Sequence, residues 1–316
     1  MLRIDGLAGG IFFIGHVSED RVENINGVRV QPGGAALYAA VAAKTLSSDV
    51  RLLSALSKDY KFLDLLEPFL SKDIKFSKMP STQFHIRYDE RWEARYLKAE
   101  HGVGSRISVS KRFLEGLGPE DAVHLSPIFP RKAYKIVEGI KRSSPETCVS
   151  VNTWMDYILK GRLNRRVLRE LAQDVDFFVL NDSEAKALAE TDSLSTAVRF
   201  LKARMLIVTL GELGAIISQE DGEIQMVPAL NYPVKKVVDT TGAGDTWCGA
   251  FVAAHKLTND LMKSVTVASV ISSIKCTNWG FTSLWNLRFN KVNDVIEYVI
   301  SLKEGSLQKR IPDYTK

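Results

Sequence analysis

A glycine-rich segment, DTTGAGD at residues 239–245, contains the residue types best suited to chemistry in this sequence. An apolar run precedes it and an amphipathic pattern follows it, so we expect a tight turn that opens a helix, with Asp245 in the first helical turn. The backbone N–H groups of Gly242, Ala243 and Gly244 would lack helical partners there, at the positive end of the helix dipole. Such groups can surround a phosphoryl oxygen, which favours phosphoryl-transfer chemistry.

Two common glycine-rich nucleotide motifs do not fit this segment. The P-loop pattern GxxxxGK[ST] is excluded because its lysine is missing, and GxGxxG is excluded because Trp247 stands where the third glycine belongs. An ordinary helix N-terminus, capped by Thr or Asp, accounts for the isolated segment as well as a phosphate site does. The segment alone therefore leaves a phosphate site and a simple cap both open.

The longer run DTTGAGDTWCGAF, residues 239–251, resembles the C-terminal signature of the ribokinase family, also called PfkB-type carbohydrate kinases. Four further motifs follow the family's order: GHVSED at 15–20, PGG at 32–34, NDSE at 181–184 and TLGELGA at 209–215. The resemblance implies an α/β fold, namely a ribokinase-like three-layer α/β/α domain with a mostly parallel central sheet and a small β-sheet lid. It also implies an ATP-dependent kinase that phosphorylates a hydroxyl of a small polyhydroxylated molecule.

The resemblance assigns roles to the glycine-rich segment. It implies that Asp245 is the catalytic base that takes the proton from the acceptor hydroxyl, and that Gly242, Ala243 and Gly244 form the anion hole for the transferred group. Phosphoryl transfer depends on positioning and charge stabilisation more than on a strong base. An aspartate with a low pKa at a helix start is therefore expected to suffice.

On the nucleotide side, Asn181 and Glu184 are three residues apart and would share the first turn of a helix. Alone, this spacing is typical of a capping box. The resemblance implies instead that both help to hold Mg²⁺, through water, together with the phosphates of ATP.

The same resemblance implies that Thr209, Gly211 and Gly214 line the nucleotide site, and that Ser269 lies near the adenine. Without it, residues 206–214 are typical of a strand that leaves through a glycine turn. Asp239 corresponds to a position that helps to bind a monovalent cation in some relatives. A hydrogen bond from Asp239 that merely closes the turn is equally consistent with the sequence.

On the acceptor side, the resemblance implies that Gly33 and Gly34 contact the substrate and that Asp20 accepts hydrogen bonds from its hydroxyls. Asn152, at the end of a predicted strand, matches a place where relatives often have a polar residue that faces the substrate. His16 lies beside the same region, although an isolated histidine is typically an ordinary hydrogen-bonded residue.

The acceptor itself is left open by these motifs. A pentose, a hexose, a nucleoside or a cyclitol such as inositol all fit, and GHVSED followed by a short ribbon resembles archaeal inositol kinases. A non-catalytic sugar- or nucleoside-binding protein of the same fold is the main alternative, but such a protein needs neither Asp245 nor the Asn181 and Glu184 pair. A dehydrogenase-like protein is disfavoured because the dinucleotide fingerprint is missing near the first predicted strand.

Short apolar runs alternate with longer amphipathic stretches, which predicts a parallel sheet covered on both faces. The predicted strands are Ile11–Ile14, Val50–Ala55, Ala122–Leu125, Cys148–Val151, Phe177–Leu180 and Leu206–Leu210. The predicted helices are Ala35–Leu46, Arg131–Lys141, Leu163–Ala172, Ser195–Lys202, one after Thr241, Leu261–Ile274 and Val292–Leu302.

Two antiparallel ribbons interrupt the alternation. One turns at Asn26-Gly27 and the other at Asp89-Glu90, whereas a third hairpin, at Asp221-Gly222, belongs to the main domain. We therefore expect a single domain over residues 1–316, with a β lid contributed by about 17–31 and 82–98. Because ribbon edges need covering, and because relatives often pair their lids, we expect a homodimer through the lid.

The composition is that of a folded globular protein, with 45% hydrophobic and 25% charged residues. The net charge is +5, but basic and acidic residues are interspersed, so we expect no nucleic-acid partner. No apolar run near the N-terminus approaches the roughly 20 residues that cross a bilayer, so we expect a cytoplasmic protein with no membrane association. The three scattered cysteines form no CxxC pair, which argues against structural zinc and disulfides.

Overall fold

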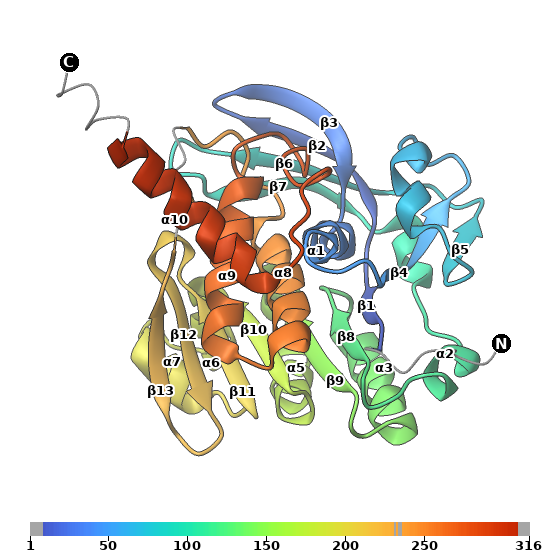
Figure 1. Ribbon diagram of the computed structural model, residues 1–316. Helices are drawn as coiled ribbons and strands as arrows, with labels where there is room; N and C mark the ends of the chain where they lie inside the picture. The colour runs from blue at the N-terminus through green and yellow to red at the C-terminus, as the bar shows by residue number, and fades with distance from the viewer. Residues whose placement is uncertain (1–8, 231, 233–235, 309–316) are drawn as a thin grey trace.

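The computed structural model describes residues 9–230, 232 and 236–308, arranged as one large sheet between two layers of helices and a small sheet above its end (Figure 1). The large sheet has the order β13-β12-β11-β10-β9-β8-β1-β4-β5. Its strands are β1 Ile11–Ile14, β4 Val50–Ser57, β5 Ile74–Ser77, β8 Ala122–Leu125, β9 Cys148–Asn152, β10 Phe177–Asn181, β11 Met205–Thr209, β12 Gly214–Gln219 and β13 Ile224–Pro228.

The large sheet is parallel from β11 to β5 and antiparallel at its other edge. All neighbours from β11 to β5 pair in parallel, whereas β12 runs antiparallel to β11 and β13 antiparallel to β12. The hairpin that turns at 221–222 therefore extends the main sheet, as the sequence predicts. Because parallel neighbours end at the same side, the carboxyl ends of β9, β10 and β11 meet along one edge.

Alternation along the strands explains the two helical layers. Ile11 and Phe13 belong to one hydrophobic cluster and Phe12 and Ile14 to another, because successive side chains of a strand point to opposite faces. The first face is covered by α1 Ala35–Lys44, α8 Ala243–Thr258, α9 Leu261–Lys275 and α10 Val292–Gln308. The second is covered by α3 Pro130–Ser143, α5 Arg162–Asp174, α6 Asp182–Ala189 and α7 Leu194–Phe200.

Short elements complete the chain. They are α2 Lys111–Glu115, α4 Met155–Leu159 and the 3₁₀ turns η1 Leu63–Phe69, η2 Gly102–Arg106 and η3 Gly211–Leu213. None of the helices in the described part is long and apolar enough to cross a membrane.

The small sheet has the order β3-β2-β6-β7, with strands β2 Ser18–Asn24, β3 Gly27–Gly33, β6 Thr82–Tyr88 and β7 Ala94–Glu100. Both hairpins are antiparallel, and β2 joins them by pairing in parallel with β6. Because β2 follows β1 directly, the small sheet arches over the carboxyl end of the large one (Figure 1). We call this small sheet the lid.

Tight packing of α1 against α8 positions the start of α8. A side-chain carbon on Gly249 would lie 2.0 Å from the backbone oxygen of Ala39, so only glycine allows the two helices to approach this closely. Trp247 and Phe251 stack with ring centroids 5.2 Å apart on the buried face of α8.

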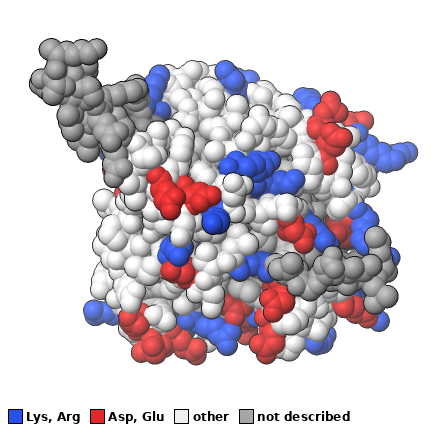
Figure 2. All heavy atoms as spheres, in the orientation of Figure 1, with Lys and Arg blue, Asp and Glu red and all other residues white. Residues whose placement is uncertain are grey.

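The predicted fold class is confirmed by this architecture. The extent of the single domain, 1–316, stays a prediction, and its two ends lie outside the described residues. On the face seen in Figure 2, basic and acidic side chains are interspersed.

Candidate active site

A cavity of about 310 Å³ lies between the lid, the carboxyl ends of the central strands and the start of α8. This is the side of an open α/β sheet at which ligands bind, and the volume suits a small molecule. The predicted site residues that line it are Asp20, Gly34, Asn152, Asn181, Glu184, Thr209, Gly242, Ala243, Gly244 and Asp245. The cavity lining does not include Gly33, Gly211, Gly214, Asp239 or Ser269.

The start of α8 is a tight turn that only glycine fits. Gly242 has φ 70°, and a side-chain carbon there would lie 2.4 Å from the ring of Tyr38. A side-chain carbon on Gly244 would meet nothing within 4 Å, so this residue borders the open cavity.

The N–H groups of this turn are partly used within it. Ala243 N–H donates to the Thr240 carbonyl at 3.0 Å, so the expectation that it is unpaired is wrong. The reason is that the chain closes a turn at 240–243 before the helix begins. No acceptor for the N–H of Gly242 or Gly244 lies among the described residues, and both remain available to an anion.

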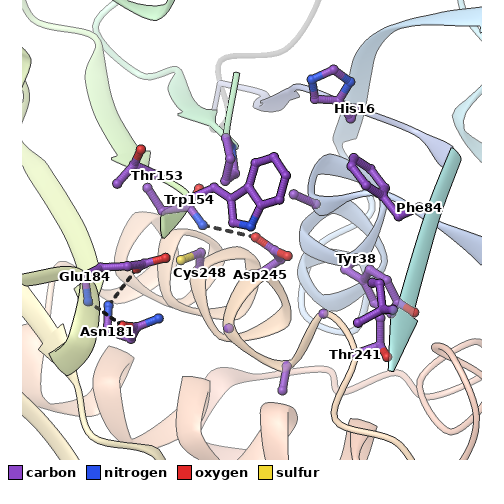
Figure 3. A pocket seen from close by; sticks show the side chains of 18 of the residues that line it. His16, Tyr38, Phe84, Thr153, Trp154, Asn181, Glu184, Thr241, Asp245 and Cys248 are labelled. Carbon is purple, nitrogen blue, oxygen red and sulfur yellow. Dashed lines mark hydrogen bonds between the residues drawn. The ribbon is translucent and has the colours of Figure 1, made fainter. Parts of the chain in front are cut away.

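Asp245 lies in the first turn of α8 and is held from the neighbouring strand end. Asn152 Nδ2, at the end of β9, donates to Asp245 Oδ1 at 3.0 Å. This bond is the dashed line that ends at Asp245 in Figure 3. Burial raises the pKa of Asp245 to about 6, although the Asn152 hydrogen bond acts in the opposite direction. The expectation of a low pKa is therefore wrong, because desolvation outweighs the amide donor.

Asn181 and Glu184 form the capping box that their spacing suggests. Asn181 Oδ1 accepts from Glu184 N–H at 2.8 Å, and Glu184 Oε2 accepts from Asn181 N–H at 3.0 Å (Figure 3). Burial raises the pKa of Glu184 to about 8, and the charge of Asp245 acts in the same direction. Both side chains nevertheless face the cavity that contains Asp245.

The other residues predicted on the nucleotide side have structural partners. Thr209 Oγ1 donates to the Leu180 carbonyl at 3.3 Å from the end of β11. Ser269 Oγ donates to the Val265 carbonyl at 3.0 Å and accepts from Trp247 Nε1 at 3.4 Å, which joins α8 and α9. Their nucleotide roles stay predictions.

On the opposite wall, Asp20 projects from β2 and is 2% exposed. Ser18 Oγ donates to it at 2.6 Å, and burial raises the pKa of its carboxyl to about 7. A side-chain carbon on Gly33 would lie 1.9 Å from Asp20 Oδ2, so Gly33 makes room for this carboxyl. Gly34, with φ 97°, lies so close to the His16 carbonyl that a side-chain carbon would not fit there.

An aromatic wall above the cavity is the part of the site that sequence reasoning missed. Trp154 is its centre, with ring centroids 4.8 Å from Tyr96, 5.9 Å from Phe84 and 5.4 Å from Tyr157. His101 stacks on Tyr157 at 6.1 Å and 16°. The alternating pattern of β6 is visible in the sequence, but it does not reveal that this face of the ribbon covers a cavity. We call Phe84, Tyr96, His101, Trp154 and Tyr157 the aromatic wall.

His16 also lines the cavity and differs from an ordinary hydrogen-bonded histidine. Its Nδ1 is buried and has no hydrogen-bond partner among the described residues. Burial, with smaller effects from His101 and Lys132, lowers the pKa of His16 to about 3, so the ring is neutral.

The sequence profile of the pfkB family of carbohydrate kinases matches residues 114–286. The chain belongs to this family. Enzymes of the family are ATP-dependent phosphotransferases that act on hydroxyl groups, and this is the class of reaction of the present chain. The predicted ribokinase resemblance and kinase activity are thereby confirmed.

Several relatives of this carbohydrate-kinase family are similar over most of their length. The cytidine kinase of Thermococcus kodakarensis is 28% identical over 283 residues, which cover 86% of this chain and 97% of that protein. Among solved structures, a nucleoside kinase of Burkholderia thailandensis in complex with inosine has a TM-score of 0.75 at 18% identity, covering 92% of this chain and 97% of the other. Ribokinase from Giardia lamblia has a TM-score of 0.74 at 21% identity, with 92% and 99% covered.

The Asn152–Asp245 contact gives a prediction about titration. Removing the amide donor with Asn152→Leu should raise the pKa of Asp245 above about 6, because the hydrogen bond favours the charged carboxylate. Carboxyl ¹³C NMR of aspartate-labelled protein measures this shift, with Asp245→Asn identifying the resonance. An unchanged or lowered pKa in Asn152→Leu would show that the contact does not stabilise the carboxylate.

Proposed function

We propose that this kinase transfers the γ-phosphoryl group of ATP to a hydroxyl of a nucleoside, with Asp245 as the catalytic base. The observation that carries the proposal is the position of Asp245, which shares one cavity with the open N–H groups of α8 and with an aromatic wall. Asp245 and the N–H groups suit phosphoryl transfer, and the aromatic wall suits stacking against the flat base of a nucleoside.

Asp245 suits a base that works near neutral pH. With a pKa of about 6 it is ionised at pH 7, yet it is more basic than an ordinary aspartate and can accept a hydroxyl proton as the phosphoryl group arrives. Asn152 is a positioning residue in this scheme, because its amide fixes the carboxylate oxygen that it contacts. Asn152 also lines the cavity, and its expected contact with the substrate stays a prediction.

The turn before α8 receives the negative charge of the transferred group. Gly242 and Gly244 N–H groups lie at the positive end of a helix of 16 residues, where an anion is stabilised by both the dipole and direct hydrogen bonds. Ala243 contributes by shaping the turn through its bond to Thr240. Preorganised donors of this kind supply a large part of the stabilisation of such transition states.

Magnesium fits the nucleotide side only through water. Asn181 Oδ1 and Glu184 Oε2 already accept capping hydrogen bonds, and no group of three or more His, Cys, Asp or Glu in the described part of the chain could hold a metal ion. Glu184, with its raised pKa, would ionise beside a divalent cation and hold its water shell. Bound Mg²⁺ would neutralise charge on the ATP phosphates.

The remaining nucleotide-side residues are proposed as the walls of the ATP site. Thr209 faces the cavity at the end of β11, and the turn that follows uses Gly211 with φ 60° and Gly214 with φ 115°. Ser269 lies behind α8 and would reach adenine only through rearrangement of its bond with Trp247. The phosphates of ATP would thus point toward α8 from the open side of the sheet.

The acceptor side is proposed to hold a ribose beneath a base. Asp20 faces the cavity from the lid and offers its carboxyl to sugar hydroxyls, with Gly33 and Gly34 making the close backbone approach possible. The aromatic wall provides faces on which a base can stack, and Trp154 follows the same strand end that carries Asn152. The similarity to a cytidine kinase over nearly its whole length supports a nucleoside over a free sugar or a cyclitol.

The lid supplies closure and is the proposed dimer surface. Closure over the acceptor would exclude water and limit hydrolysis of ATP. The outer surface of the lid exposes Val28 and Val30 on the edge strand β3, at 52% and 53%. Pairing of two lids would cover this edge.

The nucleoside assignment predicts the effect of removing the central ring of the wall. Trp154→Ala should lower kcat/KM for a nucleoside about 5- to 150-fold, because stacking of a base on an aromatic side chain is worth about 1–3 kcal/mol. Trp154→Phe, which keeps a ring, should retain most of the activity. An ATP-consumption assay with cytidine, inosine, adenosine, ribose and inositol tests both points. Preference for ribose or inositol over every nucleoside would overturn the assignment.

The base assignment predicts a loss of turnover in Asp245→Asn. The variant should lower kcat by roughly 10² or more while ATP still binds, since the proton acceptor is lost but the turn remains. The matched control is Asp260→Asn, because Asp260 lies outside the cavity lining, where it caps α9 and pairs with Lys263, and asparagine caps equally well. In the wild type, kcat/KM should fall as the pH drops through about 6, where Asp245 becomes protonated. Near-normal turnover of Asp245→Asn would refute the role.

A further inference from the structure

A lysine lies fully buried behind the turn that begins α8. Lys275 is the last residue of α9, and its side chain is 0% exposed. Its Nζ donates to the Asp239 carbonyl at 2.7 Å and lies 3.5 Å from Asp239 Oδ2. It also lies 5.5 Å from the centre of the Tyr38 ring. A fully buried ammonium is rare and needs compensating partners, so its place here requires an explanation.

The partners of Lys275 are the residues that shape the proposed anion hole. Asp239 opens the segment 239–245, and its Oδ1 accepts from Thr241 N–H at 2.8 Å. Tyr38 is the residue whose ring lies against Gly242, which has the left-handed conformation that the turn needs. The ammonium therefore contacts both the residue that begins the turn and the ring that supports its end.

Further bonds join the end of α9 to the same turn. Ser272 Oγ donates to the Ala243 carbonyl at 2.8 Å, and Val238 N–H donates to the Cys276 carbonyl at 2.8 Å. Gly280 N–H donates to Asp239 Oδ2 at 2.9 Å. These bonds hold the end of α9, where Lys275 lies, against the turn whose N–H groups face the cavity.

A monovalent cation from solution does not fit at Asp239. Both of its carboxylate oxygens already accept hydrogen bonds, Oδ1 from Thr241 and Oδ2 from Gln31 Nε2 at 3.1 Å and from Gly280. A potassium ion at Oδ2 would have to displace the donors from Gln31 and Gly280, and it would face the ammonium of Lys275, whose Nζ lies 3.5 Å from that oxygen. The expectation that Asp239 helps to bind such an ion therefore disagrees with the residues around it.

Lys275 and Asp239 each favour the charged form of the other. Burial lowers the pKa of Lys275, but the nearby Asp239 raises it. Burial also acts against ionised Asp239, yet Lys275 and the hydrogen bonds from Thr241 and Gln31 hold the pKa of Asp239 below its ordinary value. The 3.5 Å separation of Nζ from Oδ2, with the hydrogen bond from Nζ to the Asp239 carbonyl, favours the charged form of both groups.

We propose that Lys275 is a built-in cation that fixes Asp239 and the turn at 239–242, so that this enzyme needs no monovalent cation from solution. Lys275 does not line the cavity, and its role is that of a positioning residue. The consequence for turnover rests on the proposed function of the turn as an anion hole. The consequence for cation binding does not.

The wild type gives the first test. Turnover with ATP and the acceptor, and the melting temperature of the free protein, are measured in KCl, NaCl and tetramethylammonium chloride at equal ionic strength. We expect neither quantity to depend on which cation is present. Activation by KCl, or a rise in the melting temperature specific to KCl, would overturn the proposal. Absence of turnover with every acceptor would refute the proposed function, whereas the melting temperatures would still decide the cation question.

Two substitutions give the second test. Lys275→Ala leaves space beside Asp239, so its melting temperature should fall and should rise again with KCl or methylammonium chloride, as expected for an ion that binds only the folded state. Its kcat should fall about 10- to 100-fold, the size expected when a catalytic group is misplaced, and should recover with the same ions. Lys275→Met fills the space without charge and should show the loss without the recovery.

The control is Lys263→Met on the same helix. Lys263 is partly exposed and pairs with Asp260, at 3.6 Å, so this variant should match the wild type in all three salts. If Lys275→Met keeps the kcat and melting temperature of the wild type, the ammonium is not needed and the proposal is wrong. If Lys275→Ala does not fold, the wild type and Lys275→Met still decide between the two outcomes.

Discussion

The contact on which the site depends is that between the first turn of α8 and the end of β9. There Asn152 Nδ2 donates to Asp245 Oδ1 at 3.0 Å, which places a carboxylate from a helix over the edge of a parallel sheet. The contact is possible because α8 lies close to α1, where Gly249 allows the Ala39 backbone to approach, and because Gly242 adopts a left-handed turn against Tyr38. Without these glycines the helix start could not face the cavity.

The electrostatics of the cavity follow from the same geometry. Asp20, Glu184 and Asp245 approach it from the lid, α6 and α8, and burial raises their pKa values to about 7, 8 and 6. Three carboxyl groups around one small space favour ligands that bring hydroxyl donors or a hydrated cation. Behind the turn, by contrast, the buried Lys275 balances Asp239. The cavity thus suits ligands that donate hydrogen bonds or bring a cation, whereas the charge of Asp239 in the turn behind it is already balanced by Lys275.

Much of the main sheet can be predicted from sequence because its strands are short apolar runs between helices. Strands 11–14 and 122–125 have the bounds that the sequence predicts, and the glycine-rich turn, the capping box and the lid ribbons follow from local patterns. Strand β5 is not predicted, since its four residues include exposed Lys75 and Phe76 and lack the apolar pattern of a buried strand. Local patterns report only on neighbours along the chain, which is why some elements can be predicted from the sequence and others cannot.

The parts of the site that sequence does not predict depend on contacts between distant segments. The aromatic wall joins Phe84 and Tyr96 of the lid to Trp154 after β9, and nothing in either segment reveals the other. The raised pKa of Asp245 and the pairing of Lys275 with Asp239 likewise arise from burial between helices that meet only in the folded chain. Helix-end chemistry alone suggests a low pKa for Asp245, and the packed environment reverses it.

The most direct test of the proposed mechanism is a crystal structure of the protein with a nucleoside and a non-hydrolysable ATP analogue. We predict that an Asp245 carboxylate oxygen lies within about 2.6–3.2 Å of a ribose hydroxyl, the reach of a general base, and that the terminal phosphate lies against the N–H groups of Gly242 and Gly244. A ribose bound away from Asp245, or a terminal phosphate outside the turn of α8, would contradict this mechanism.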